Sequence, residues 1–262
     1  MTKSILTRRQ LIRFGALGAS SLALGGCEQF DLLGIRNSNV RNFVEKANDL
    51  TYYVQRFLIG DALAREYPES EIRQPQRPNG STNPQTPEYL ALKAADFSGY
   101  RLSVSGLVET PKSYSLSELR NMPSRTQITR HDCVEGWSCI AKWTGTPLSV
   151  VLDEVKLKPA ARYLVFHCYD TMGSGRGGPA HYYESCDLAD AWHPQTILAY
   201  GLNDQVLPVS NGAPIRVRIE RQLGYKQPKY LRAIEAVSSF ADIGRGKGGY
   251  WEDRGYEWYA GI

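Results

Sequence analysis

The apolar residues after position 100 switch repeatedly between strand and helix patterns, and this limits the fold more than any other feature. Tyr100, Leu102 and Val104 alternate with polar residues, as in a half-buried strand. Further predicted elements are a helix between the capping box Ser115–Glu118 and Pro123, a helix from Thr146-Pro147 to Val155, and strands at 163–168, 207–219 and 233–237. Because strands and helices do not alternate as regular βαβ units, the sequence predicts an α+β fold.

The first 26 residues look like an export signal. A basic start is followed by an apolar run over 14–24, which is too short to span a bilayer as a helix. Residues 7–13 fit the twin-arginine pattern, with an ordinary secretory signal as the alternative. Leu24-Gly25-Gly26-Cys27 is similar to a lipoprotein cleavage box, which would make Cys27 the acylated first residue of the mature chain. The alternative is cleavage nearby without a lipid.

Charge and export route bear on the kind of partner. Four of the 31 basic residues lie before residue 27, so 27 remain against 27 acidic residues. A nearly neutral mature chain gives no case for binding nucleic acid through bulk charge. The twin-arginine route carries proteins that are already folded, which favours a cofactor inserted before export. We therefore predict a periplasmic enzyme with a complex cofactor.

An N-terminal helical segment, 27–75, precedes the main domain, which we place at 76–262. Apolar residues recur at helical spacing from Val40 and stop near Gly60, and we interpret this stripe as core packing. Prolines at 68, 75, 78, 84 and 87 then break the chain into a long loop. Such a loop either wraps a functional site or is a flexible linker. The aromatic residues at 250–259 are expected to pack against the domain.

Four cysteines follow Cys27: Cys133, Cys139, Cys168 and Cys186. In an oxidising compartment they would form two disulfides, with three pairings open. Arg130 and His131 precede Cys133 closely and would favour its thiolate, which suits either nucleophilic attack or metal ligation. The spacings of zinc fingers, redox Cys-x-x-Cys pairs and covalent haem sites are absent from the sequence.

The segment Cys133-Val134-Glu135-Gly136-Trp137-Ser138, followed by Trp143 and Gly145, resembles the metal-ligating motif of the sulfite oxidase superfamily. The similarity is closest to the periplasmic sulfoxide-reductase-like branch. A second block, 211–216 followed by Gly224-Tyr225-Lys226, and a third at His193-Pro194 occur in the same order as in that family. The resemblance covers roughly residues 77–240.

This resemblance implies a mixed-sheet molybdopterin-binding domain of the sulfite oxidase type, without the C-terminal immunoglobulin-like dimerisation domain, and hence a monomer. It implies a molybdenum-molybdopterin cofactor with Cys133 as the only protein ligand of the metal, a reasonable role for a soft thiolate. The residues implied to bind the cofactor are Asn79, Cys133, His167, Asn211, Arg216 and Lys229, of which Arg216 and Lys229 would bind its phosphate. The implied catalytic residues are Cys133, Glu135 and Arg130.

Most of these residues also have a purely structural interpretation. Arg216, Arg218 and Glu220 alternate and could form the solvated face of a strand. Asn211-Gly212 could be only a turn, and His167 could be a core histidine. Glu135 could simply brace its loop. The cysteines other than Cys133 are expected to be packed thiols or a disulfide.

Oxygen-atom transfer to or from a small molecule is the activity that the resemblance implies. The sequence lacks haem-attachment and iron-sulfur motifs, so we predict a separate b- or c-type cytochrome as electron partner. Glu135 lies where sulfite oxidases carry arginines, which favours reduction of a neutral S-oxide or N-oxide. Sulfite oxidation, for which Arg130 could bind the anion, is the alternative. A metal-free scaffold lipoprotein with a Cys133–Cys139 disulfide is the rival from another class. The Gly-rich run 244–249 precedes aromatic residues and not a helix pattern, which argues against a nucleotide site.

Overall fold

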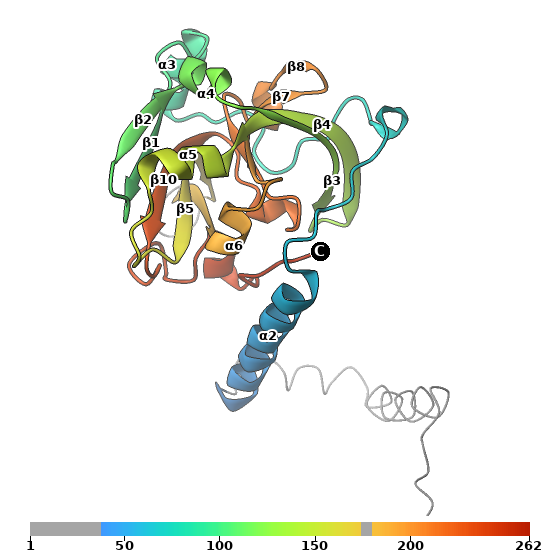
Figure 1. Ribbon diagram of the computed structural model, residues 1–262, viewed down its shortest axis with the longest axis vertical. Helices are drawn as coiled ribbons and strands as arrows, with labels where there is room; N and C mark the ends of the chain where they lie inside the picture. Colours follow the sequence, from blue (N-terminus) through green and yellow to red (C-terminus); the bar gives the residue numbers. More distant parts are fainter. Residues whose placement is uncertain (1–37, 174–179) are drawn as a thin grey trace, which may run out of the picture. The chain divides into compact units, whose positions relative to one another are not determined.

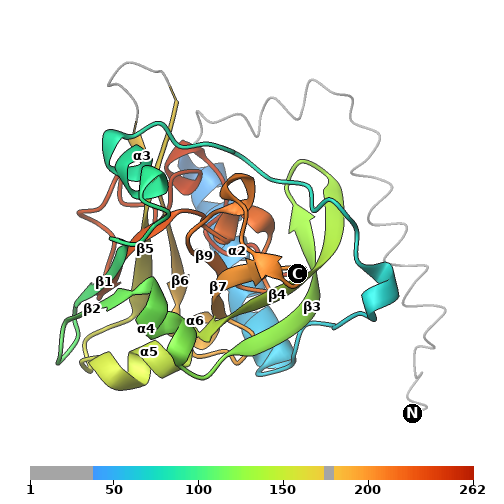
Figure 2. The same ribbon diagram turned by 90° about the horizontal axis from the view of Figure 1, so that it is seen from above.

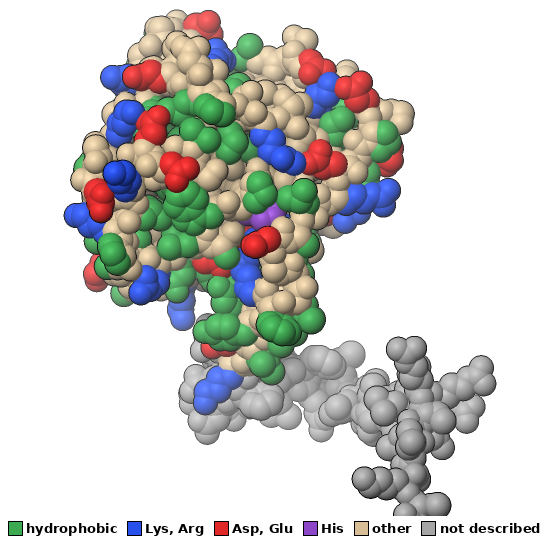
Figure 3. All heavy atoms as spheres, viewed as in Figure 1, with side chains coloured by type: hydrophobic (Ala, Val, Ile, Leu, Met, Phe, Trp, Pro, Cys, Tyr) green, Lys and Arg blue, Asp and Glu red, His purple; other side chains and the backbone are tan. Residues whose placement is uncertain are grey.

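The computed structural model describes residues 38–173 and 180–262, which form two compact units divided after Gly60. The predicted signal and Cys27 lie outside the described residues. In the first unit, helix α2 (Ser38–Ile59) confirms the helix expected from Val40 to Gly60. Its apolar residues Leu50, Tyr53, Val54, Phe57 and Leu58 are exposed, Phe57 to 87%. Hydrophobic side chains accordingly gather along α2 in the space-filling view (Figure 3). Within this unit the stripe is exposed, and its expected role in core packing stays a prediction.

The second unit, from Asp61 onwards, contains two layers of strands with short helices (Figure 1). Its elements are α3 (Pro87–Ala94), β1 (Arg101–Gly106), β2 (Lys112–Ser115), α4 (Leu116–Asn121), β3 (Arg125–Cys133), β4 (Trp137–Pro147), α5 (Leu148–Val155), β5 (Tyr163–Met172), β6 (Ala180–Asp187), α6 (Leu188–Ala191), β7 (Ile197–Leu202), β8 (Gln205–Val206), β9 (Arg216–Arg218) and β10 (Leu231–Val237). Four 3-10 turns join them: η2 (Glu69–Glu71), η3 (Val209–Asn211), η4 (Gly224–Lys226) and η5 (Glu252–Arg254).

The two sheets have the strand orders β2-β1-β10-β5-β6 and β3-β4-β7-β8, and β9 also pairs with β7. All pairs are antiparallel except β1 with β10, where Val104 lies opposite Ile234. Seen from above, β1, β2, β5 and β6 lie on one side of the unit and β3, β4 and β7 on the other (Figure 2). The main core is formed by apolar residues of both sheets together with α5. This arrangement confirms the predicted mixed-sheet α+β fold.

Short sequence patterns predicted most of the individual elements. Ser115 Oγ accepts the amide of Glu118, and the Glu118 carboxylate accepts the amide of Ser115, so the capping box of α4 is present. The predicted strand at 207–219 is wrong apart from β9. Pro208 cannot donate a ladder hydrogen bond, and Gly212 has φ of +117°, so the chain turns through η3 before β9 begins.

The proline-rich loop runs along the second sheet and does not behave as a linker. The amides of Tyr67 and Arg73 donate to the carbonyls of Ile128 and Ile140, at 2.9 and 3.0 Å. These contacts attach the loop to β3 and β4 at two points. They carry the following residues, 79–81, towards the end of β3. Of the two interpretations of this loop, the structure supports the one in which it wraps a site.

The Gly-rich run 244–249 wraps a carboxylate of the chain itself. The amides of Arg245 and Lys247 donate to Asp253, at 2.9 and 3.2 Å, and the Tyr183 hydroxyl donates to the same carboxylate at 2.6 Å. A Cβ on Gly244 would lie 2.4 Å from Asp253 Oδ2. The backbone amides of the loop thus form an anion-binding site, and the anion that they bind is the chain's own Asp253.

Within residues 38–173 and 180–262 none of the four cysteines forms a disulfide, and Cys139, Cys168 and Cys186 are buried. They are packed thiols, one of the two outcomes expected for them, and the two disulfides are absent. In the same ranges we find no helix with both the length and the apolar character needed to cross a membrane.

Candidate active site

A cleft with a cavity volume of about 140 Å³ opens at the end of β3, where Cys133 is half-buried. Cys133 pairs with Trp137 across the β3–β4 hairpin, and Gly136 turns the chain with φ of +83°. The tip of this hairpin, Val134 and Glu135, forms one rim of the cleft. A thiol at the end of a rigid strand is therefore presented to an open cleft.

The proline-rich loop supplies the opposite wall through Asn79, Gly80 and Ser81. Lys229 attaches this wall to the domain, because its Nζ donates to the carbonyls of Asn79 (2.5 Å), Ser81 and Ser210 (3.2 Å). Burial lowers the pKa of Lys229 to about 7. Burial makes the charged form of Lys229 unfavourable, and an anionic ligand group beside it would offset this desolvation cost.

Asp170, near the end of β5, forms the floor of the cleft. Its Oδ2 accepts the Ser81 hydroxyl at 2.6 Å, while its buried Oδ1 has no partner within the described residues. Burial raises the pKa of Asp170. Asn79 Oδ1 is likewise buried and unpaired. These two buried acceptors on one cleft offer hydrogen-bond sites to a ligand with N–H groups.

The sequence argument that Arg130 and His131 favour the Cys133 thiolate is wrong. Arg130 lies on the opposite face of β3 and binds the Asp132 carboxylate at 2.9 Å. His131 is buried beside Arg218, and burial first and Arg218 second lower its pKa well below the usual value. Burial raises the pKa of the Cys133 thiol in the absence of a metal.

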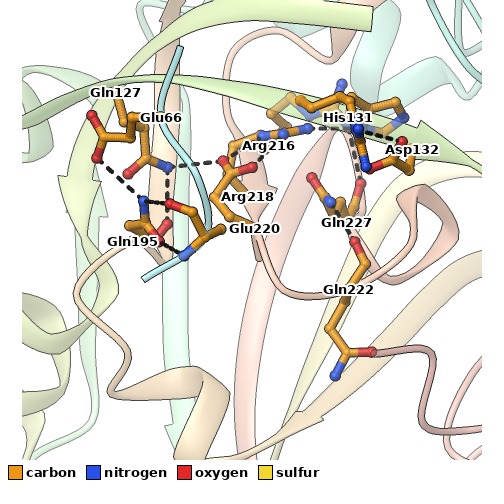
Figure 4. A network of polar contacts seen from close by, with 12 residues as sticks. Glu66, Gln127, His131, Asp132, Gln195, Arg216, Arg218, Glu220, Gln222 and Gln227 are labelled. Carbon is orange, nitrogen blue, oxygen red and sulfur yellow. Dashed lines mark hydrogen bonds and ion pairs between the residues drawn. The ribbon is translucent and has the colours of Figure 1, made fainter. Parts of the chain in front are cut away.

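A buried polar network stands behind the Cys133 strand (Figure 4). Arg218 donates to His131 Nδ1 at 2.8 Å and to both oxygens of Glu220 at 3.0 and 2.6 Å. Gln127 donates to Glu220 at 2.8 Å, which ties β3 to the segment after β9. A Cβ on Gly224 would lie 2.5 Å from His131 Nε2, so η4 packs directly on this ring. The alternative interpretation of Arg216, Arg218 and Glu220 as a solvated face is wrong, since these side chains are buried.

Asn211 and Arg216 lie beneath the loop wall. Arg216 donates to the carbonyls of Asn211 (3.0 Å) and Gln227 (3.2 Å), and its guanidinium lies over the ring of Trp143 at 5.0 Å. Its Nε is buried and unpaired, and burial lowers the pKa of Arg216 to about 9. Asn211 is buried and donates to the carbonyl of Gln76 at 3.5 Å. Asn211 is thus more than a surface turn residue.

The structure brings Asn79, Cys133, Glu135 and Lys229 to the cleft, while the other four predicted site residues, Arg130, His167, Asn211 and Arg216, lie outside its lining. His167, on β5, pairs with Glu235 at 3.0 Å and lines a second pocket. Arg130 is half-exposed and lies outside the cleft lining.

Several cleft residues were missed by the sequence analysis: Ser81, Asp170, Met172, Tyr182, Gln227, Trp251 and Tyr256. Ser81 directly follows the Asn79-Gly80 pair, and this adjacency was an available signal. Tyr225 also lines the cleft and belongs to the second motif block, although no role was assigned to it. Asp170 and Trp251 had no local signal, because only the fold brings them near Cys133.

The residues present fit a pterin with a thiolate-bound metal. A half-buried thiol offers a soft ligand, Asn79 and Asp170 offer unpaired acceptors for ring N–H groups, and Lys229 offers a buried cation. The comparison with known families agrees: the model described as "Oxidoreductase molybdopterin binding domain" matches residues 89–242. The chain belongs to this family. It is a molybdopterin-dependent oxidoreductase.

Relatives of this molybdopterin oxidoreductase carry related names. It is 37% identical to a "Putative protein-methionine-sulfoxide reductase subunit YedZ1" of Azospira oryzae, over 97% of this chain and 87% of the relative. It is 38% identical to the "Protein-methionine-sulfoxide reductase catalytic subunit MsrP" of Ralstonia nicotianae, over 53% of this chain and 44% of that protein. The chain thus spans less than half of the latter.

Among solved structures, the sulfane dehydrogenase SoxCD from Paracoccus pantotrophus shares the fold of this molybdopterin oxidoreductase. The TM-score is 0.50 at 19% sequence identity, and the match covers 68% of this chain and 45% of the other. At this identity the likeness concerns the fold alone. Together with the family match it confirms the sulfite oxidase type of fold expected from the Cys133 motif. The metal-free scaffold hypothesis is not supported, because the family binds a cofactor and Cys133 and Cys139 are both free.

Proposed function

We propose that this oxidoreductase reduces a neutral S-oxide of the methionine sulfoxide class. The observation that carries the proposal is the charge of the cleft around Cys133. Its described lining contains the acidic residues Glu135 and Asp170 and contains Lys229 as its only lysine or arginine. The Lys229 ammonium donates to three backbone carbonyls, of Asn79, Ser81 and Ser210. A sulfite dianion would meet carboxylates there, while a neutral oxide pays no such cost.

The reaction needs two electrons and two protons: the S–O bond of the oxide breaks, a sulfide is released, and the oxygen leaves as water. The cofactor, when bound, supplies the two-electron oxygen-transfer chemistry. We propose a separate cytochrome as the electron source. The names of the relatives from Azospira and Ralstonia support a sulfoxide as the oxidant.

The chain's own residues are proposed to hold the cofactor and limit access. Cys133 is the metal ligand, Asn79 and Asp170 accept hydrogen bonds from the pterin, and Lys229 neutralises its phosphate. We propose that Arg216 donates a hydrogen bond to the cofactor through its unpaired Nε. The backbone carbonyl of Asn211 holds the Arg216 guanidinium in place. Glu135, whose carboxylate accepts the Trp137 indole N–H at 2.9 Å, repels anions at the rim.

Steady-state kinetics test the direction of the reaction. With a reduced viologen dye as electron donor, we expect turnover of methionine sulfoxide. With sulfite and an oxidised acceptor, we expect a kcat/KM at least about a hundredfold lower, the discrimination a misplaced charge in a polar site can provide. Glu135→Gln should reduce the difference in kcat/KM between the two substrates by raising the activity with sulfite. Rapid sulfite oxidation by the unmodified enzyme would overturn the proposed direction and favour the sulfite-oxidising alternative.

We also propose a periplasmic location, reached by the twin-arginine route, with a lipid on Cys27. The exposed apolar stripe of α2, from Leu50 to Leu58, is in keeping with a helix that lies at a membrane surface. Cys27→Ser should shift the active enzyme from the membrane to the soluble periplasmic fraction. Replacement of Arg8 and Arg9 by lysine should leave it in the cytoplasm. An unchanged distribution in both variants would contradict the proposal.

A further inference from the structure

The C-terminal segment after Val237 forms an aromatic wall of the active-site cleft, although the family match ends at residue 242. Trp251 and Tyr256 line the cleft that contains Cys133. Their rings lie 5.2 Å apart and 36° from parallel, and Tyr225 meets Tyr256 edge-on at 5.3 Å. Met172 lines the same space. We call Trp251 and Tyr256 of the C-terminal segment, together with Tyr225 and Met172 from earlier in the chain, the aromatic wall.

Buried ionic contacts hold the wall in place. Glu252 follows Trp251 directly and accepts the Lys226 ammonium at 2.6 Å, and Lys226 also binds Glu184. All three side chains are buried. A Cβ on Gly249 would lie 2.0 Å from Glu252 Oε2, so a larger residue there would displace this carboxylate. Removing one partner of such a cluster leaves a buried charge uncompensated, which makes alternative positions of the segment costly.

The residues on both sides of the wall are fixed as well. Asp253 is enclosed by the Gly-rich run, and the Tyr225 hydroxyl donates to the carbonyl of Glu257 at 2.7 Å. Beyond the wall, Ala260 accepts the amide of Leu223 at 2.9 Å. The segment is therefore attached before, within and after Tyr256. A surface held this firmly can discriminate between ligands by shape.

We infer that Trp251 and Tyr256 determine substrate specificity by packing against the apolar groups beside the S-oxide. The inference rests on the proposed function. Packed aromatic rings next to a methionine side chain offer a polarisable, apolar surface, while the unpaired acceptors and the thiol lie on the other walls. Aromatic rings make favourable contacts with sulfur and with methylene groups. The wall therefore favours a sulfoxide on a flexible carbon chain, such as a peptidyl methionine sulfoxide, over a compact oxide.

The test compares a peptide containing methionine sulfoxide with dimethyl sulfoxide, using full-length holoenzyme and a reduced viologen dye. In Trp251→Gln and Tyr256→Gln, the ratio of kcat/KM for the peptide to that for dimethyl sulfoxide should fall about tenfold, through KM more than kcat. Trp251→Phe should keep most of the ratio. The matched control is Trp192→Gln, a tryptophan that is 40% exposed and outside the cleft lining.

The outcomes distinguish a failure of the aromatic wall's proposed role from a failure of the proposed sulfoxide reduction. An unchanged ratio in both Gln variants, with molybdenum content intact, would overturn the role of the wall. An equal loss with both substrates, accompanied by a lower molybdenum content, would show that the wall only supports the fold and would overturn it too. Failure of the unmodified enzyme to reduce either sulfoxide would instead reject the proposed function. Tyr256, which is 39% exposed, keeps the test usable if Trp251→Gln does not fold.

Discussion

Replacement of Cys133 by serine is expected to reduce turnover by more than about a hundredfold, the upper range for losing a group that merely supports a metal ligand. A hydroxyl is a harder and much less acidic ligand than a thiol, so it cannot replace a thiolate on a redox metal. The half-buried position at the end of β3 tolerates the change in size. The variant should therefore unfold at nearly the same temperature as the unmodified apoprotein. Steady-state kinetics and thermal unfolding measure the two effects separately.

Cys139→Ser is the matched control for this variant. Cys139 lies on the neighbouring strand β4, is buried and does not line the cleft. We expect it to lose some stability, because a hydroxyl enters a packed site, and to keep its activity per bound cofactor. Equal losses of turnover in the two variants would mean that Cys133 has no special role.

Replacement of Arg218 by methionine is expected to lower the free energy of unfolding by about 3–5 kcal/mol, because it leaves the Glu220 carboxylate buried without its cation. Both side chains of this pair have no exposed surface. Arg218 also donates to His131, two residues before Cys133, and lies over the Trp143 ring at 4.4 Å. Urea-induced unfolding of the complete chain measures the loss.

Two further variants show whether burial of the charge is the cause. Arg101→Met removes one partner of an exposed pair with Glu118 and should cost less than about 1 kcal/mol. Adding Glu220→Gln to Arg218→Met should recover part of the loss, since the amide leaves no charge in the core. A similar loss in Arg101→Met and Arg218→Met, or no recovery in the double variant, would contradict the importance of the buried pair.

Local patterns predicted the elements that depend on neighbours in the sequence. The capping box placed α4, the apolar run placed β5, and helical spacing placed α2. The strand expected at 207–219 failed because Pro208 and Gly212 impose a turn that outweighs the apolar pattern. The alternation of Arg216, Arg218 and Glu220 suggested a solvated face, because sequence cannot show that Trp143 and His131 cover these side chains.

The site residues also fall into two groups: those that the sequence indicated and those that only the fold brings together. The motif around Cys133 and the Asn79-Gly80 pair could be found by resemblance, and both lie at the cleft. Arg130 was misplaced because its side chain lies on the other face of the strand from Cys133, as the period of two requires. Asp170 and the aromatic wall were missed because β5 and the C-terminal segment approach Cys133 only through the tertiary fold. The lowered pKa of His131 likewise depends on burial first and then on Arg218, a residue far along the chain.

The content of molybdenum and pterin in the natively purified enzyme tests the central claim most directly. After expression with ample molybdate, elemental analysis and pterin release should find about one of each per chain, with loss of the metal in Cys133→Ser and retention in Cys139→Ser. A folded, unmodified protein that contains neither molybdenum nor pterin would contradict the assignment of Cys133 and the cleft around it.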